Sequence, residues 1–166
     1  MTSNLYDESV PVFNHFLGNL KTILVKAKTH ATEHRIDEAA LLLDRLLPDM
    51  FTMTRQVQIA CDSAKGAVAR LAGVEIPKHP DVEASFDELI ARVDRTLAFI
   101  ASVPHTAFEG SHQRQIVLQF GDWRREFTAA DFLRTWALPN FYFHIATAYG
   151  LLRHNGVPVG KMDYLG

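Results

Sequence analysis

The chain has 166 residues, of which 48% are hydrophobic and 22% are charged, and its formal net charge at pH 7 is −2. This length and composition predict one globular domain over residues 1–166, with enough apolar side chains to build a core. A net charge of −2 gives no general attraction to nucleic acid or to an acidic membrane surface, so we expect neither as a partner.

The sequence carries no recognisable export or membrane signal. Residues 1–8 lack the basic and apolar regions of a secretory signal. The longest uncharged stretch, residues 135–152, contains Pro139, Asn140 and His144 and is shorter than the ~20 apolar residues that a membrane-spanning helix needs. We therefore expect a cytoplasmic protein.

The first part of the chain has a helical pattern. Apolar side chains at three- and four-residue spacing predict an amphipathic helix over about residues 9–30, with Pro11 in its first turn. Asp37 is expected to cap a short connecting helix that runs to Leu46. The long helix then contributes to the core, and the short one links it to the next element.

Two more long helices are predicted in the middle of the chain. An apolar stripe of about six turns indicates a helix over residues 50–71 that Gly73 ends. A third amphipathic pattern covers residues 82–100, and Asp81 is expected to cap it. The prolines between the two patterns mark a loop.

A different pattern precedes the last long helix. Residues 115–120 and 123–127 are rich in β-formers on either side of a turn, which predicts a short hairpin that leans on the helices. Thr128 is expected to cap a short helix over residues 129–134, and Pro139 to begin the last long helix.

The C-terminal tail, residues 157–166, is too rich in Gly and Pro to predict a helix and too apolar for a free linker, so we expect it to pack back on the helices. Four long helices with accessory elements predict an all-α four-helix bundle with short connector helices and a small β-hairpin before the last long helix.

No specific enzyme motif is present, so function must be sought in weaker groups of residues. Cys61 lies among apolar residues and is expected to be a buried structural thiol. His30 and His34 have the spacing of a chelating pair, but no third ligand is near in sequence, which favours an exposed polar helix end.

The helix predicted over residues 50–71 has two polar rows. The first row has the spacing of a solvated face with an Asp62–Lys65 ion pair, and it comprises Arg55, Gln58, Asp62 and Lys65. The second row allows close helix approach or a small polar cavity, and it comprises Gln56, Ala60, Ser63 and Ala67.

His144 lies at the edge of the apolar stripe of the last helix, so we expect it to be partly buried. Its position suits a hydrogen-bonded core histidine, and a partly buried imidazole in a bundle is also how metals are held. Both alternatives stay open at this point.

The same helix carries a family resemblance. The pattern consists of Pro139-Asn140-Phe141-Tyr142-Phe143-His144, Ala148-Tyr149, Leu152-Arg153-His154-Asn155-Gly156-Val157 and Gly160-Lys161. It resembles an uncharacterised bacterial domain-of-unknown-function family within the DinB-like (YfiT-like) superfamily. The resemblance implies an antiparallel four-helix bundle, often a homodimer, in which three histidines hold a divalent metal such as Zn, Ni or Mn.

When the superfamily's three-histidine metal site is mapped onto this sequence, only one of the three ligand positions is a histidine. The superfamily pattern places a ligand at His144, but Asn140 stands where the other histidine of the last helix is expected, and the second long helix has no histidine. Gln56 or Asp62 could join Asn140 as an oxygen ligand. Alternatively the site is a metal-free polar pocket lined by His144, Asn140, Gln56 and either Tyr149 or Arg55.

Three hypotheses about function follow from the resemblance. The preferred one is a small-molecule-binding protein whose ligand pocket comprises Arg55, Gln56, Asp62, Asn140, His144 and Tyr149. The alternatives are a divalent-metal-dependent hydrolase or thiol transferase, and a structural homodimer without an active site. Lys161, Asp163 and Tyr164 of the tail could close over the pocket.

Overall fold

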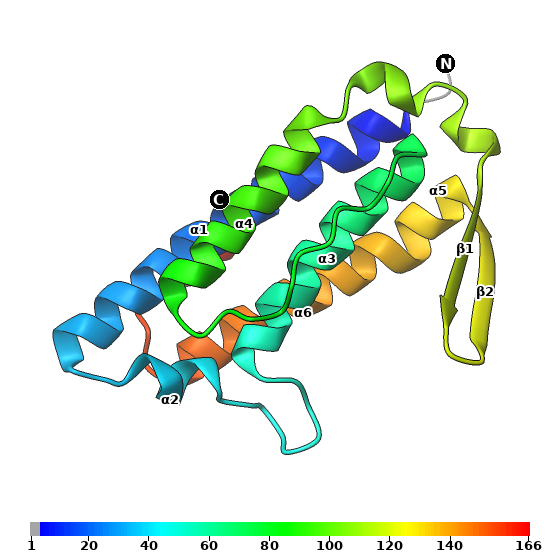
Figure 1. Cartoon of the computed structure of the whole chain (residues 1–166). Coiled ribbons are helices and arrows are strands. Elements are labelled where there is room, and N and C mark those ends of the chain that lie inside the picture. The colour runs from blue at the N-terminus through cyan, green and yellow to red at the C-terminus, as the bar shows by residue number, and fades with distance from the viewer. Residues whose placement is uncertain (1–3) are drawn as a thin grey trace.

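The computed structural model describes residues 4–166. Residues 1–3, the first part of the stretch 1–8 that was searched for a secretory signal, lie outside the described residues. Four long helices form a bundle (Figure 1), namely α1 (Leu5–His34), α3 (Met53–Ala72), α4 (Phe86–Ser102) and α6 (Leu138–His154). Around the bundle α1 contacts α4, α4 contacts α3, α3 contacts α6, and α6 contacts α1. The all-α bundle is therefore confirmed.

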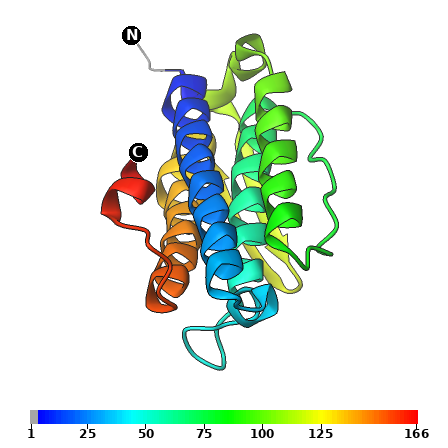
Figure 2. The same cartoon turned by 90° about the vertical axis from the view of Figure 1, so that its left-hand side faces the viewer.

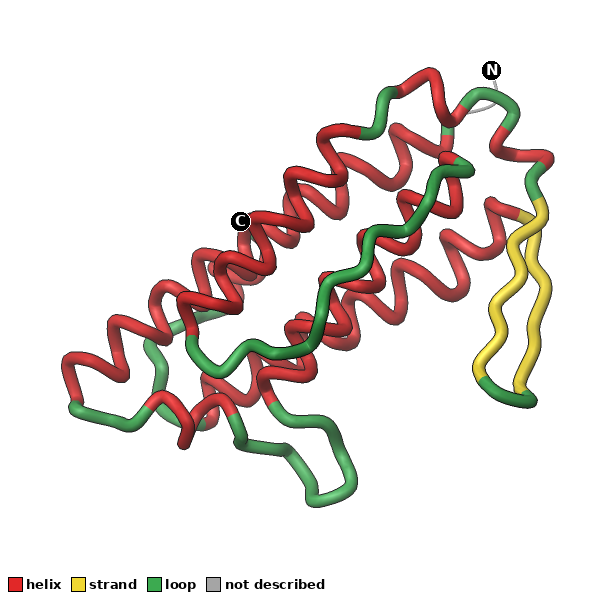
Figure 3. Tube along the Cα trace, viewed as in Figure 1, coloured by secondary structure: helices red, strands yellow, loops and turns green. Residues whose placement is uncertain are grey.

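A long connection sets the direction of the helices. Residues 73–85, which we call the crossover loop, run back along α3 before α4 begins (Figure 3). As a result α3 and α4 point the same way, while α1 with α4 and α3 with α6 are antiparallel (Figures 1 and 2). The crossover loop thus lies against the outside of the bundle beside α3.

α1 begins earlier than its apolar pattern predicted and ends later. The Asn4 side chain caps it by accepting a hydrogen bond from the Tyr6 backbone N–H over 3.0 Å. Pro11 consequently lies inside the helix and not in its first turn. Because Pro11 is exposed, the backbone carbonyl that its missing N–H leaves unpaired can be hydrated.

Two other helix boundaries also differ from the prediction. The connector α2 (Glu38–Leu42) stops before Leu46. α4 begins at Phe86 because Ser85, not Asp81, caps it by accepting from the Glu88 N–H. The Asp81 carboxylate instead forms ion pairs with Arg55 and Arg92.

The predicted hairpin is confirmed. β1 (Gln115–Phe120) pairs in antiparallel fashion with β2 (Trp123–Thr128). The opposed residues Ile116 and Phe127 are both buried and join the helical core, which provides the support that two strands alone would lack.

The hairpin passes into α6 without a break. α5 (Ala129–Phe132), capped by Thr128 as predicted, continues through a π-helical turn, Leu133–Ala137, into α6. The prediction of a separate helix ending near Arg134 and a new start at Pro139 was therefore wrong. Pro139 lies just after the wide turn, where the proline is tolerated near the start of α-helical geometry.

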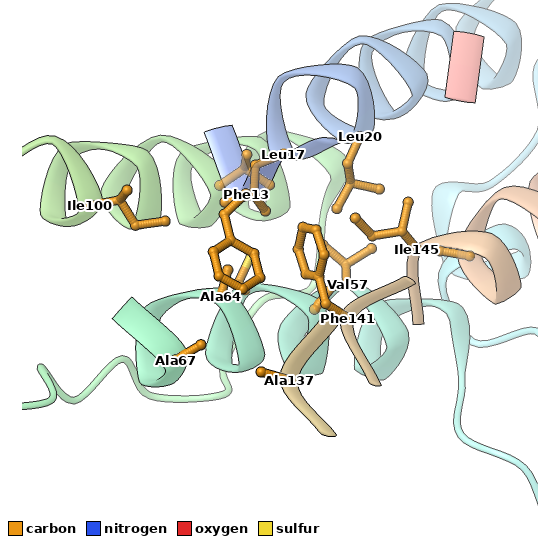
Figure 4. Packing of buried hydrophobic residues seen from close by; sticks show 14 of the residues in the cluster. Phe13, Leu17, Leu20, Val57, Ala64, Ala67, Ile100, Ala137, Phe141 and Ile145 are labelled. Atoms are coloured by element: carbon orange, nitrogen blue, oxygen red, sulfur yellow. The ribbon is translucent and has the colours of Figure 1, made fainter. Parts of the chain in front are cut away.

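The core fills the space between the four helices (Figure 4). Phe13 of α1 and Phe141 of α6 meet at its centre, with ring centroids 4.9 Å apart and planes at 82°. Ala64 and Ala67 of α3 are buried in the same cluster, and Ala67 belongs to the predicted row that allows close helix approach.

The tail packs back on the bundle as expected, but it contains a short helix, α7 (Lys161–Leu165), which the Gly and Pro content argued against. Asp163 explains the difference, because its carboxylate accepts the Gly160 N–H over 2.8 Å and so starts the turn. Lys26 of α1 holds the same carboxylate at 2.5 Å. None of the helices within residues 4–166 combines the length and hydropathy required to cross a membrane.

Candidate ligand-binding cleft

A cleft of about 770 Å³ opens beside α3. Its walls are the crossover loop, strand β1, and the π-helical turn that leads into α6. The apolar part of the lining includes Ile59, Ile76, Pro77, Leu118, Phe120, Phe132 and Trp136. Small-molecule sites typically have this size and a largely apolar lining.

The cleft is positively charged although the chain as a whole is negative. Its basic side chains are Arg55, Lys65, Arg70 and Lys78, and Asp62 is the single carboxylate in the lining. Arg55 forms an ion pair with Asp81, and Lys65 lies 2.9 Å from Asp62. Arg70 and Lys78 have no carboxylate partner within residues 4–166, so the excess charge lies at their end of the cleft.

Arg70 lies flat against its own helix. Its Nη1 donates to the Gly66 carbonyl over 3.0 Å, and a Cβ at position 66 would lie 2.6 Å from that nitrogen. Glycine at 66 therefore makes the room that this guanidinium occupies. Burial lowers the pKa of Arg70 from its usual value, which means that water solvates the charge only in part.

A buried arginine fixes the wall of the cleft. Arg92 of α4 is fully buried and contacts the carboxylates of Asp62, Asp81 and Glu83 at 2.9 to 3.1 Å. Its Nη1 also donates to the Pro80 carbonyl over 3.1 Å. These contacts join the crossover loop to both α3 and α4.

Glu83 is the inward anchor of the crossover loop. Burial tends to raise the pKa of its carboxyl group, but hydrogen bonds from Gln58, its own backbone and Arg92 outweigh burial and hold the pKa below its usual value. Gln58 donates to it over 2.9 Å. Gln58 and Lys65 are each only 4% exposed, because the crossover loop covers this face of α3. The prediction of a solvated face was therefore wrong. The predicted Asp62–Lys65 ion pair is confirmed.

His144 forms a hydrogen bond across the bundle next to the cleft. Its Nδ1 lies 2.6 Å from Oε1 of Gln56, whose amide nitrogen in turn donates to the Phe51 carbonyl. An amide oxygen only accepts, so Nδ1 carries the proton. Burial, reinforced by the positive charge of Arg55, lowers the pKa of His144 to about 4. His144 is therefore a neutral, hydrogen-bonded core histidine.

The residues around His144 do not fit the three-histidine metal site that the resemblance implied. The Gln56 oxygen already accepts from His144, and the Asn140 amide donates to Ser63 Oγ over 2.8 Å. Asp62 is engaged by Arg92 and Lys65. Within residues 4–166 no three His, Cys, Asp or Glu side chains are grouped so that they could hold a metal ion.

The remaining candidates for metal or thiol chemistry are also engaged elsewhere. The rings of His30 and His34 pack 4.2 Å apart on the partly exposed end of α1. Cys61 is buried, and burial raises the pKa of its thiol to about 12, which confirms the structural thiol.

The structure divides the sequence-predicted pocket into three places. Arg55, Asp62 and Asn140 line the cleft. Gln56 and His144 pair with each other between α3 and α6. Tyr149 faces Tyr164 of α7, with ring centroids 6.2 Å apart, on the side of the bundle where the tail lies.

The tail itself does not close over the cleft. Asp163 is bound to Lys26 of α1, and the backbone carbonyl of Tyr164 accepts from Asn19 of the same helix over 3.0 Å. The hypothesis that the tail acts as a lid was therefore wrong: its polar groups find partners on α1.

Sequence reasoning missed the residues that shape the cleft most. Arg70, Phe120 and Trp136 converge only because the hairpin folds back beside α3. Arg92 carried a usable signal, since it follows Leu89 by three residues on the buried side of α4, where a charged residue requires buried partners.

Comparison with known proteins extends over nearly the whole chain. The family model described as "Domain of unknown function (DUF1993)" matches residues 5–165. Among solved structures, the chain is similar to a DinB family member protein from Shewanella denitrificans, with 44% sequence identity, a TM-score of 0.90, and coverage of 98% of this chain and 92% of that chain. No curated protein matches the chain. These similarities confirm the resemblance indicated by the last helix.

Proposed function

This chain belongs to the DinB-like DUF1993 family, a family of domains of unknown function, and from that premise we propose that it binds a small molecule with an apolar body in the cleft beside α3. One observation carries the proposal: a cleft of about 770 Å³ whose walls are mostly apolar and whose outer wall is fixed by a buried ion-pair network. A preformed site of this kind spares the ligand the cost of ordering the protein.

Exposed aromatic side chains at the hairpin support the same proposal. Phe120 is 60% exposed and Trp123 is 41% exposed, and their ring centroids lie 5.6 Å apart. Trp123 also packs against Trp136 of the π-helical turn at 5.2 Å. An apolar ligand seated between β1 and α3 would remove part of this aromatic surface from water.

The π-helical turn adds a further argument. Leu133–Ala137 brings Trp136 and Ala137 into the lining of the cleft. Such wide turns cost regular hydrogen bonding and often occur at functional sites. Retaining one in the wall of the cleft fits a binding role better than a purely structural one.

Fluorescence titration with the neutral apolar dye N-phenyl-1-naphthylamine tests this function. We expect saturable binding that weakens by about tenfold in Phe120→Ala, because that ring forms part of the apolar wall. Phe143→Ala is the matched control, since Phe143 is 54% exposed and lies outside the lining. Dye binding that is not saturable, or that both variants weaken equally, would contradict the proposal.

A further inference from the structure

Part of the excess charge of the cleft lies on a partly buried guanidinium, that of Arg70. Arg70 uses one N–H to bind the Gly66 carbonyl, and a guanidinium has five N–H donors in a planar fork. No carboxylate within the described chain, residues 4–166, forms an ion pair with it. An arginine partly buried against apolar walls without a counter-charge is costly for the free protein.

Capping of α3 does not account for this arginine. Near the end of α3, the carbonyls of Ala69 and Arg70 accept from the backbone N–H groups of residues 73 and 74, and the Leu71 carbonyl accepts from the Arg114 side chain. Arg70 contacts none of these orphan positions and bonds instead one turn earlier, at Gly66. Because Arg70 lines the cleft and its guanidinium has no other hydrogen bond within residues 4–166, its remaining donors can bind a ligand there.

The surroundings of Arg70 select the kind of anion. Apolar groups from the crossover loop, β1 and the π-helical turn line the same cleft, among them Ile76, Leu118 and Trp136. Arg70 is near the C-terminal end of α3, where the negative end of the helix dipole opposes a doubly charged group such as phosphate more strongly than a singly charged one. One guanidinium in these surroundings matches one singly charged, planar group.

We propose that the cleft binds an organic monocarboxylate, with the carboxylate paired to the Arg70 guanidinium and an aromatic or other apolar body against the walls that include Phe120 and Trp136. This inference rests on the proposed function and specifies the ligand class for it. Lys78, which is exposed in the crossover loop, adds a second positive charge that attracts anions to the cleft.

Isothermal titration calorimetry with 2-naphthoate and its neutral counterpart 2-naphthalenemethanol tests the inference. Wild-type protein is expected to bind the carboxylate at least about tenfold more tightly than the alcohol. Arg70→Met is expected to weaken naphthoate binding by about tenfold and to leave binding of the alcohol within about twofold. Arg153→Met, which removes an exposed arginine near the end of α6, should change neither.

The outcomes separate this inference from the proposed function. If the neutral dye saturates the cleft but naphthoate and the alcohol bind equally, or Arg70→Met binds both as wild type does, the monocarboxylate is overturned while small-molecule binding stands. If the dye and both naphthalenes fail to bind, both proposals fall. Should Arg70→Met not fold, the carboxylate preference of the wild type still decides, because it requires no variant.

Discussion

Arg92 of α4 and Glu83 of the crossover loop form an ion pair over 3.1 Å in which neither side chain is more than 2% exposed. Breaking a buried pair by removing one partner leaves a charge in a poorly solvated place, which costs more than the pair itself contributes. The pair therefore holds the outer wall of the cleft in position.

Arg92→Met is expected to lower the free energy of unfolding by about 3 kcal/mol, because Glu83 then stays buried with the half-exposed Arg95 as its one remaining ion-pair partner within residues 4–166. Urea denaturation measures the loss. Trypsin cleavage after the exposed Lys78 should also become faster, since the crossover loop is less firmly held. Lys21→Met is the control. It removes a solvent-exposed ion pair between α1 and Asp94 of α4, the helix that carries Arg92, and should cost less than about 1 kcal/mol. Equal losses in the two variants would show that the buried pair has no special role.

His144 predicts a specific pH dependence. Its pKa is about 4 in the folded protein, below the ordinary 6.5, so the unfolded chain takes up a proton first as the pH falls. The stability that the neutral ring contributes is complete above pH 6.5 and is lost as the pH falls toward 4.

Between about pH 7 and pH 5 this loss should be on the order of 2 kcal/mol in the wild type and absent in His144→Gln. Urea denaturation of both proteins across that range provides the comparison, and NMR titration of the His144 ring provides a direct value. A ring that titrates near pH 6.5 would contradict the assignment of a buried, neutral histidine.

Cys61 should not react with a thiol reagent in the folded protein. Its thiol is buried, and its pKa of about 12 leaves almost no thiolate at neutral pH. Ellman's reagent is expected to react with one thiol per chain only after urea is added. Rapid reaction of the native protein would mean that the α3 core opens readily.

Removal of α7 should affect stability without affecting the cleft. Deleting residues 161–166 removes the ion pair of Asp163 with Lys26 and the packing of Tyr164 on Phe16, so the melting temperature is expected to fall. Affinity for N-phenyl-1-naphthylamine should stay within about twofold, because the tail contacts α1 and not the cleft. A large loss of affinity for the dye would contradict the conclusion that the tail does not cover the cleft.

The bundle was predictable from the sequence because helical periodicity is a local signal. The hairpin was predictable for the same reason, since its β-formers flank a turn. Helix ends were less predictable: Asp81 resembles a cap in sequence, but long-range ion pairs with Arg55 and Arg92 recruit it, and Ser85 caps α4 instead.

The candidate site was only partly predictable. Arg55, Asp62 and Asn140 of the predicted pocket line the cleft, because α3 and α6 pack side by side, whereas Gln56, His144 and Tyr149 do not. The side chains of Phe120, Trp136 and Arg70 come from separate elements, and their convergence depends on where the hairpin and the crossover loop pack. No spacing within one segment encodes that packing.

The central claim is that the cleft beside α3 is where a small molecule binds, and amide chemical-shift mapping with N-phenyl-1-naphthylamine tests it most directly. The account predicts that the perturbed amides gather in the crossover loop, β1 and Leu133–Ala137. Perturbations that gather instead around Tyr149 and α7, or that spread over the surface without saturating, would contradict it.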